Sequence, residues 1–419
     1  MFTKRLTVIG AVCTAAALAL TGCSSESSAP EGENQSSTSE ATGTADRGPI
    51  TFAMGKNDTD KLQPVIEKWN ADHPDEQVEL KELAGEADAQ RETLVQSLQA
   101  GSSDYDVMAL DVIWTADFAA NQYLAPLEGD LKVDASGLLP ATVESATYQG
   151  KLYALPQNTN GQLLFRNTDL VTDAPANWAE LAESCKGLDK DCLTLQLKQY
   201  EGLTVNTTGF INGWGGSVLD DSEQPAVETD QAKEGIQALV DGYADGTIAK
   251  ASTSATEEET NLAFTEGNTA YAINWPYMYT NAEKAGINFE VTPLVGKDGT
   301  GVSTLGGYNN GININSKHKA TARDFIEFII NEDNQASFAD ASFPPVLASI
   351  YDDATLVEKY PYLPALKESL ENAKPRPVSP FYPAISKAIQ DNAYAAITAG
   401  KSVDDATKDM AAAITQASK

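Results

Sequence analysis

Three aromatic side chains in the stretch INWPYMYTNA, residues 273–282, are the clearest candidates in the sequence for a binding surface. Trp275, Tyr277 and Tyr279 fall within five positions, and Pro276 interrupts them. Tyr and Trp combine a flat apolar ring with a polar edge, so they suit a ligand that has both kinds of surface. Packing in the core is the alternative for each ring. We expect Trp275 and Tyr277 to form one wall of a binding site and Tyr279 to be structural.

Two charged residues occupy positions suited to recognition. Asp111 ends the apolar run YDVMALD, residues 105–111, which is typical of a strand buried in a parallel sheet. Ligands of open α/β sheets gather beyond the carboxyl ends of the strands, although Asp111 could also cap the helix that follows. Arg376 lies between Pro375 and Pro377, which hold its backbone extended. An Arg presented so rigidly is better suited to binding than to solvation.

The usual signatures of catalysis are missing from the sequence. It contains no Gly-x-Ser-x-Gly, no Gly-rich phosphate loop and no His-x-x-x-His, and its 2 His, His73 and His318, stand in ordinary polar contexts. We therefore expect no enzyme, no cofactor and no metal site. Carboxylates are abundant, so a pair of the kind used by glycosidases stays open as an alternative.

The body of the chain alternates between strand and helix patterns from Pro49 onward. ITFAM, QLLFRN and TAYAIN read as strands, and TAYAIN leads directly to Trp275. DTDKLQPVIEKWNADHP and ATARDFIEFII have apolar residues at helical spacing, and Asn177 and Glu180 form a capping pair for another helix. A chain of this length is too long for one small core, so we expect two α/β domains with more than one crossover between them.

The N-terminus is typical of an exported protein. A basic start, an apolar run and small residues precede Cys23, which is the layout of a secretory signal over residues 1–22. Residues 20–23, LTGC, resemble the lipobox of bacterial lipoproteins, which implies that Cys23 becomes the first mature residue and carries lipid. Two acyl chains make such anchoring stable. Residues 23–48, rich in Ser, Thr and Glu, are expected to form a flexible tether.

Cysteine usage and charge fit an exported protein. Of the 4 Cys, Cys13 lies in the signal and Cys23 is the expected lipidation site. Cys185 and Cys192 remain, and a small disulfide loop is the natural interpretation of this pair. The formal net charge is −31, and loss of Lys4 and Arg5 with the signal leaves about −33. So acidic a protein is repelled by nucleic acid and by anionic membranes. We expect no nucleic-acid partner.

Four segments together resemble a known family. They are DVMALDVIWTADFAANQYLAPL, FTEGNTAYAINWPYMYTNA, TLGGYNNGININ and AKPRPVSPFYPAISKAIQDNAYAAI. They resemble the solute-binding proteins of ABC sugar importers, in the trehalose- and maltose-binding branch of the maltose-binding-protein-like group. The likeness covers the chain from about residue 50 to residue 414. It implies an α/β, two-lobe periplasmic-binding-protein-like fold of type II, with a mixed sheet flanked by helices in each lobe.

The resemblance also implies how the chain is divided and where the ligand binds. Lobe 1 is expected over residues 49–157 and 311–346, and lobe 2 over 158–310 and 347–419, with the ligand in the cleft between them. Asn160 stands where the family often has Asp, and Tyr308 replaces the commoner Trp. The residues expected to contact the ligand are Asp58, Arg91, Asp111, Asn158, Asn160, Trp275, Tyr277, Gly307, Tyr308, Asn310 and Arg376.

These residue types suit a carbohydrate. A pyranose offers an apolar face and a rim of hydroxyls, so its site needs aromatic rings together with planar donors and acceptors. The resemblance implies capture of an α-linked gluco-disaccharide (trehalose, maltose or a short maltodextrin) at the outer face of the cytoplasmic membrane, and delivery to the ABC permease subunits. We expect a monomer that binds no nucleotide. A lipid-anchored glycoside hydrolase and a binding protein for a non-sugar solute are the alternatives.

Overall fold

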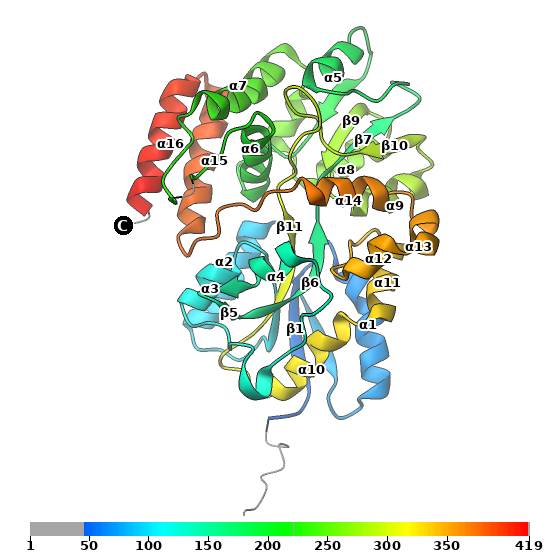
Figure 1. Ribbon diagram of the computed structural model, residues 1–419, viewed down its shortest axis with the longest axis vertical. Coiled ribbons are helices and arrows are strands. Elements are labelled where there is room, and N and C mark those ends of the chain that lie inside the picture. The colour runs from blue at the N-terminus through cyan, green and yellow to red at the C-terminus, as the bar shows by residue number, and fades with distance from the viewer. Residues whose placement is uncertain (1–45, 221, 418–419) are drawn as a thin grey trace, which may run out of the picture. The chain divides into compact units, whose positions relative to one another are not determined.

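The computed structural model describes residues 46–220 and 222–417, which belong to the compact unit Gly43–Lys419. The predicted signal, the lipidation site at Cys23 and the tether up to residue 45 lie outside the described residues. Two main sheets organise the described part of the chain (Figure 1). Within these residues, no helix combines the length and the apolar character needed to cross a membrane.

The first sheet has five strands in the order β2-β1-β3-β11-β6. They are β1 (Ile50–Gly55), β2 (Val78–Leu83), β3 (Val107–Asp111), β6 (Ala154–Asn160) and β11 (Gly306–Ile312). β1, β2 and β3 are parallel, whereas β11 runs antiparallel to both β3 and β6. The chain therefore returns to this sheet after a long excursion, and the return places Tyr308 opposite Asp111.

The second sheet has four strands in the order β10-β7-β9-β8. They are β7 (Leu163–Asn167), β8 (Asp191–Thr194), β9 (Thr269–Asn274) and β10 (Phe289–Thr292). β8 is parallel to β9, and the other pairs are antiparallel, so this sheet is mixed as well. A small hairpin joins β4 (Thr147–Tyr148) to β5 (Lys151–Leu152). We call the parts built around the two sheets the five-stranded lobe and the four-stranded lobe.

The chain passes between the sheets where β6 leads into β7. Only Gly161 and Gln162 separate the two strands, so a short segment joins the lobes here. The lobe limits given above at residues 157 and 310 fall inside β6 and β11, and they stay a prediction.

Helices flank both sheets (Figure 1). Those that pack with the first sheet include α1 (Thr59–Asp72), α2 (Ala87–Gln99), α3 (Thr115–Ala120), α4 (Pro140–Ser145), α10 (Lys319–Ile329) and α11 (Glu332–Asp340). The second lobe includes α5 (Trp178–Ser184), α6 (Glu201–Gly213), α7 (Asp230–Asp245), α8 (Glu257–Thr265), α9 (Tyr277–Ala285), α15 (Tyr382–Ala399) and α16 (Val403–Ala417). Three further helices lie between α11 and α15, namely α12 (Ala348–Asp352), α13 (Ala354–Lys359) and α14 (Leu363–Glu371). Single 3-10 turns occupy Gly129–Leu131 and Lys250–Ser254.

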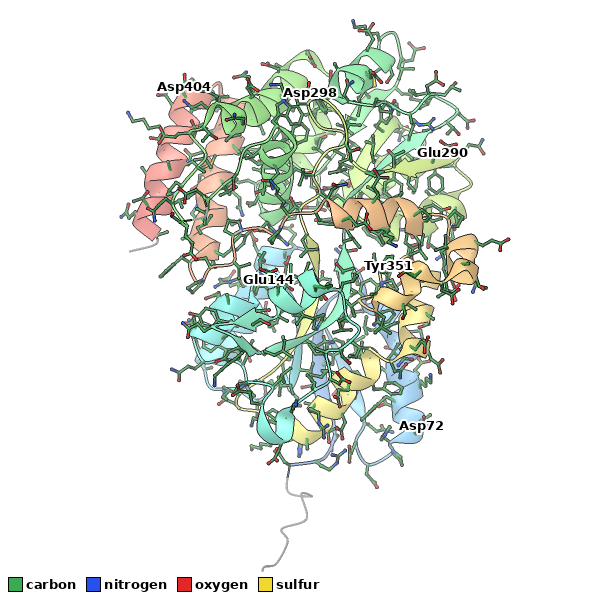
Figure 2. All side chains as sticks on the ribbon, viewed as in Figure 1. Asp72, Glu144, Glu290, Asp298, Tyr351 and Asp404 are labelled. Carbon is green, nitrogen blue, oxygen red and sulfur yellow. A yellow bond between two sulfur atoms is a disulfide. The ribbon has the colours of Figure 1, made fainter. Side chains whose placement is uncertain are left out.

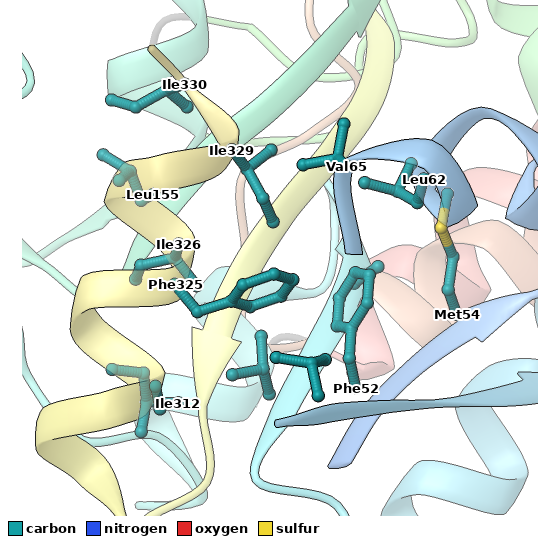
Figure 3. Packing of buried hydrophobic residues seen from close by; sticks show 14 of the residues in the cluster. Phe52, Met54, Leu62, Val65, Leu155, Ile312, Phe325, Ile326, Ile329 and Ile330 are labelled. Atoms are coloured by element: carbon teal, nitrogen blue, oxygen red, sulfur yellow. The ribbon is translucent and has the colours of Figure 1, made fainter. Parts of the chain in front are cut away.

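The core of the five-stranded lobe forms where α10 covers the sheet. Phe325, Ile326 and Ile329 make an apolar stripe at helical spacing, as the sequence predicts, and all three are buried. Figure 3 shows Phe325 beside Phe52 of β1, and their ring centroids lie 5.8 Å apart in an edge-to-face arrangement. Fully burying one such side chain stabilises the fold by roughly 1.5–3 kcal/mol.

The four-stranded lobe has its own core and a covalent link at the edge of that core. Leu193 and Tyr271 pack from the sheet against Leu239 of α7. Cys185 and Cys192 are joined by a disulfide, with Cα atoms 5.5 Å apart, and this is the pairing that the sequence predicts. Many acidic side chains lie on the outside of the molecule, as Figure 2 shows for Asp72, Glu290, Asp298 and Asp404. The negative charge is therefore mostly solvated.

Candidate ligand-binding cleft

One pocket is lined by residues of both lobes. The five-stranded lobe contributes the loops after β1 and β2, the start of α2, the end of β3 and the start of β11. The four-stranded lobe contributes the starts of α6 and α8 and the β9–α9 junction. The full lining consists of Asn57, Asp58, Gly85, Ala87, Gln90, Asp111, Asn160, Tyr200, Glu201, Gly202, Val205, Glu257, Trp275, Tyr277, Gly306, Gly307, Tyr308, Ser342, Phe343 and Arg376.

Aromatic rings line the pocket from both sheets. Trp275 follows the last residue of β9, and Tyr277 is the first residue of α9, so the Pro276 break turns both into the cleft. The Tyr277 hydroxyl donates to the backbone carbonyl of Glu257 at 3.1 Å. Tyr308 reaches the pocket from β11 in the opposite lobe. All three side chains are partly buried, so part of each remains accessible to a ligand.

Tyr279, the third ring of the opening stretch, lies outside this lining. Its ring packs at 5.0 Å from Phe289 and at 5.3 Å from Tyr362, measured between centroids. This packing agrees with the structural role that we expected for Tyr279.

A glycine pair allows the strands to approach closely behind Tyr308. Gly307 has φ +120°, a backbone conformation that L side chains rarely adopt, and a Cβ there would lie 2.4 Å from the carbonyl oxygen of Asn158. At Gly306, a Cβ would lie 2.9 Å from the Trp275 ring. Glycine at these two positions therefore lets β11 pack against β6 and lets the indole approach the strand closely.

Arg376 forms a charged bridge at one side of the pocket. Its Nη1 donates to Oε1 of Glu201 at 2.6 Å, and its Nη2 donates to Oδ1 of Asp111 at 2.9 Å. The Arg376 side chain is 1% exposed, against 6% for Glu201 and 17% for Asp111. Burial raises the pKa of Glu201 to about 7, because loss of solvation outweighs the attraction of the guanidinium, and the nearby Asp111 adds to the rise.

Two further carboxylates enter the pocket from opposite lobes. Asp58 precedes α1, and Glu257 is the first residue of α8. Glu257 accepts a hydrogen bond from the Tyr200 hydroxyl at 2.7 Å, and Asp58 lies 3.7 Å from Nζ of Lys61. Burial raises the pKa of both carboxylates, because the cleft removes them from water.

The structure brings most of the predicted contact residues together, since Asp58, Asp111, Asn160, Trp275, Tyr277, Gly307, Tyr308 and Arg376 all line this pocket. Arg91, Asn158 and Asn310 do not line it. Arg91 bonds to Asp117, and Asn158 is buried in β6. Asn310 is buried in β11, opposite Ala109 and two positions beyond Tyr308. Ligand contact by these three residues stays a prediction.

Sequence reasoning missed several lining residues, among them Glu201, Glu257 and Tyr200. Glu201 carried a usable signal, because it is the single charged residue of α6, EGLTVNTTGFING, which is otherwise buried over nearly its whole length. Glu257 carried none, since it stands first in an EEE run that is typical of a solvated helix start. Among the described residues, no three His, Cys, Asp or Glu side chains are arranged to hold a metal ion.

Residues 55–336 match the profile of the family described as bacterial extracellular solute-binding protein. The chain belongs to this family. A curated relative from Deinococcus radiodurans, a probable ABC transporter-binding protein, is 29% identical over 351 residues, which cover 77% of this chain and 82% of that protein. The galactooligosaccharide-binding protein of Bacillus subtilis is 25% identical over 237 residues, covering 52% of this chain and 55% of the relative.

Solved structures confirm the two-lobe α/β fold of this class. Maltose-bound MalE3 of T. maritima aligns with TM-score 0.83 and 29% identity, covering 88% of this chain and 99% of that one. A solute-binding protein of Thermotoga lettingae, bound with α-D-tagatose, gives TM-score 0.80 at 20% identity with 88% and 99% covered. The GacH receptor of Streptomyces glaucescens gives 0.78 at 23% with 88% and 98% covered. The last two support the fold alone.

Proposed function

We propose that this protein is the substrate-binding component of an ABC importer and that it captures an α-linked gluco-disaccharide such as trehalose, maltose or a short maltodextrin. The observation that carries the proposal is the cleft itself. Trp275 and Tyr277 of one lobe and Tyr308 of the other give it aromatic walls, and carboxylates from both lobes line its polar side. Rings can cover the apolar face of a pyranose, while carboxylates accept hydrogen bonds from its hydroxyls.

The similar proteins support both parts of the proposal. The T. maritima structure that shares 29% of its residues with this chain is described as holding maltose, and the B. subtilis relative is named for galactooligosaccharides. The D. radiodurans relative is named as an ABC transporter-binding protein. On this proposal, the loaded protein delivers its sugar to the transmembrane permease subunits.

Closure of the lobes is the proposed mechanism. The pocket has residues of both lobes in its walls, so a ligand that touches both stabilises the closed form over the open one. A micromolar Kd corresponds to about 8 kcal/mol of net binding free energy, which several buried hydrogen bonds and stacked rings can supply. No covalent change in the sugar is required.

Anchoring is the remaining part of the proposal. The lipobox-like residues 20–23 would place lipid on Cys23, and the Ser- and Glu-rich segment after it would tether the folded lobes to the outer face of the cytoplasmic membrane. A monomer suffices, because a single chain supplies both walls of the cleft.

A thermal-shift screen against a saccharide panel tests the proposal. Trehalose, maltose and maltotriose are expected to raise the melting temperature, and the β-linked disaccharide cellobiose is the matched control. The same mixtures are then analysed chromatographically for released glucose, which separates binding from glycoside hydrolysis. Absence of any shift across the panel, or release of glucose, would contradict the proposal.

A further inference from the structure

Three charged side chains form a continuous contact between the two lobes. Asp111 ends β3 of the five-stranded lobe, and Glu201 begins α6 of the four-stranded lobe. Arg376 lies between them and bonds to both, at 2.9 Å and 2.6 Å. We infer that Glu201 is a positioning residue of the cleft. It holds Arg376 in place so that the guanidinium pairs with Asp111 when the lobes close. This inference rests on the proposed function, whose ligand-binding site it deepens.

Glu201 is fixed by more than its arginine partner. Its carboxylate also accepts hydrogen bonds from the hydroxyls of Tyr382 and Ser386, and the Ser386 contact measures 2.5 Å. These two residues stand four positions apart on α15, so one face of that helix holds the carboxylate. Glu201 therefore has a fixed position before any ligand arrives, and it can fix Arg376 in turn.

The other end of the contact leaves an acceptor oxygen of Asp111 available to a ligand. Arg376 and the backbone N–H of Ile113 both donate to Oδ1 of Asp111, at 2.9 Å and 3.3 Å. Oδ2 of Asp111 consequently has no protein donor within the described part of the chain. The buried Nε of Arg376 also has no partner among these residues, and both side chains line the pocket. The bridge thus presents one acceptor, Oδ2 of Asp111, in a set geometry, whereas the Nε of Arg376 is enclosed by protein atoms.

The arrangement differs from an ordinary ion pair that supports the fold. A buried ion pair loses solvation and adds little net stability compared with apolar side chains, so its retention needs another reason. Here the pair links the two lobes at the cleft, and on this proposal closing the lobes brings Asp111 to Arg376. Contact with the ligand and contact between the lobes are therefore made by the same two side chains.

Charges around Glu201 make the positioning sensitive to pH. Four titratable groups face its carboxyl or its backbone: Arg376 from the segment before α15, Tyr382 from α15, Asp111 from β3 and Asp88 from α2. Burial raises the pKa of Glu201 to about 7, so its charge changes near neutral pH. Protonation removes the anion that holds Arg376, and we expect ligand affinity to fall as the pH drops from 8 to 6.

Glu201→Gln tests the inference on the full chain. Glutamine keeps the size of the side chain, and its oxygen can accept from Tyr382 while its amide NH2 donates to the Ser386 hydroxyl, but it lacks the charge. We expect the Kd for the saccharide identified by the thermal-shift screen, measured by calorimetry at pH 8, to rise at least about 10-fold. We also expect the pH dependence between 6 and 8 to be lost, which a merely structural role would not produce.

Glu76→Gln is the matched control. Glu76 belongs to a second arginine bridge, in which Arg47 bonds to Glu76 and Asp324 away from the cleft. This variant is expected to keep the wild-type Kd within about 2-fold and to keep its pH dependence. Circular dichroism of both variants at the titration temperature verifies that each is folded.

Two results would overturn the inference. If the wild type binds a saccharide and Glu201→Gln binds it with the same Kd and the same pH dependence, Glu201 has no positioning role, while the proposed function stands. If the wild type binds no saccharide, the proposed function fails, and small-angle scattering of the ligand-free proteins gives a separate answer. We expect a larger radius of gyration for Glu201→Gln than for wild type, and equal radii would overturn the inference.

Discussion

Two arginines in this protein each bridge two carboxylates, one at a partly exposed site and the other at a buried site. Arg47 bonds to Glu76 and Asp324 at 2.7 Å each, with side chains 32%, 20% and 27% exposed. Arg376 makes the same kind of bridge inside the cleft, where it is 1% exposed. The pKa of Glu76 is lowered by its hydrogen bond to Arg47, whereas the pKa of Glu201 is raised by burial although it too bonds to an arginine. The extent of solvation, rather than the arginine partner, therefore decides the direction in which the pKa of each glutamate shifts.

This difference indicates what each bridge is for. An exposed pair contributes at most about 1 kcal/mol, since water and salt screen it. A buried pair carries a desolvation penalty, and breaking it leaves an uncompensated charge. The Arg47 bridge therefore adds little to stability, while the Arg376 bridge is a buried balance of charges at the point where the lobes meet.

Replacing each arginine by alanine gives the largest expected contrast. Arg376→Ala leaves Asp111 and Glu201 facing each other without a cation, and we expect it to lower the free energy of unfolding by about 3–5 kcal/mol. It should also abolish saccharide binding. Arg47→Ala is expected to cost less than about 1 kcal/mol. Urea unfolding followed by circular dichroism measures both values, and similar losses for the two variants would contradict the comparison.

The pH dependence of stability should have opposite signs at the two bridges. The raised pKa of Glu201 means that the folded state favours the protonated carboxyl. The stability that this proton contributes is fully present below about pH 4.5, and it is lost as the pH rises through about 7. A shift of this size corresponds to about 3 kcal/mol. Glu201→Gln should remove this loss, so the variant gains stability relative to wild type between pH 5 and 8.

Glu76 should behave in the reverse manner. Its lowered pKa gives a contribution that is present above its unfolded pKa and is lost as the pH falls through the folded value. Glu76→Gln should therefore lose stability relative to wild type at neutral pH and converge with it in acid. Thermal unfolding at several pH values measures both variants, and the same sign for both would break the comparison.

The aromatic wall allows a smaller test within the four-stranded lobe. Trp275→Ala removes a stacking face in the cleft, and we expect the saccharide Kd to rise about 30-fold, corresponding to about 2 kcal/mol. Tyr279→Ala, four positions further on but packed on Phe289 and Tyr362, should leave the Kd within about 2-fold and lower the melting temperature instead. Calorimetry and thermal unfolding separate the two effects, and an unchanged Kd for Trp275→Ala would remove the indole from the site.

Gly307→Ala is expected to lower the free energy of unfolding by about 1–2 kcal/mol, from placing a side chain at φ +120°. Its Cβ would also press on the carbonyl oxygen of Asn158 and displace Tyr308. We therefore expect a weaker saccharide Kd that accompanies the loss in stability. Gly299→Ala, at a glycine whose Cβ would meet no atom within 4 Å, is the control and should change neither quantity.

Local patterns in the sequence predict the elements and several site residues, because these depend on neighbours in the chain. TAYAIN followed by Trp-Pro-Tyr gives β9, its end and the two rings of the cleft, and the two prolines around Arg376 mark a rigid segment. The bridge to Glu201 could not be predicted in this way, because the two residues are 175 positions apart. The same holds for Asn310, which is fully buried in the middle of β11 by parts of the chain that are distant in sequence.

The central claim is that the cleft captures a saccharide between the two lobes and releases it unchanged. Calorimetric titration of the wild-type protein with trehalose and with maltose at pH 8 tests it most directly. The account predicts one site per chain with a micromolar Kd for at least one of the two sugars, and recovery of the intact sugar afterwards. No heat with either sugar, or with longer α-glucans, would contradict it.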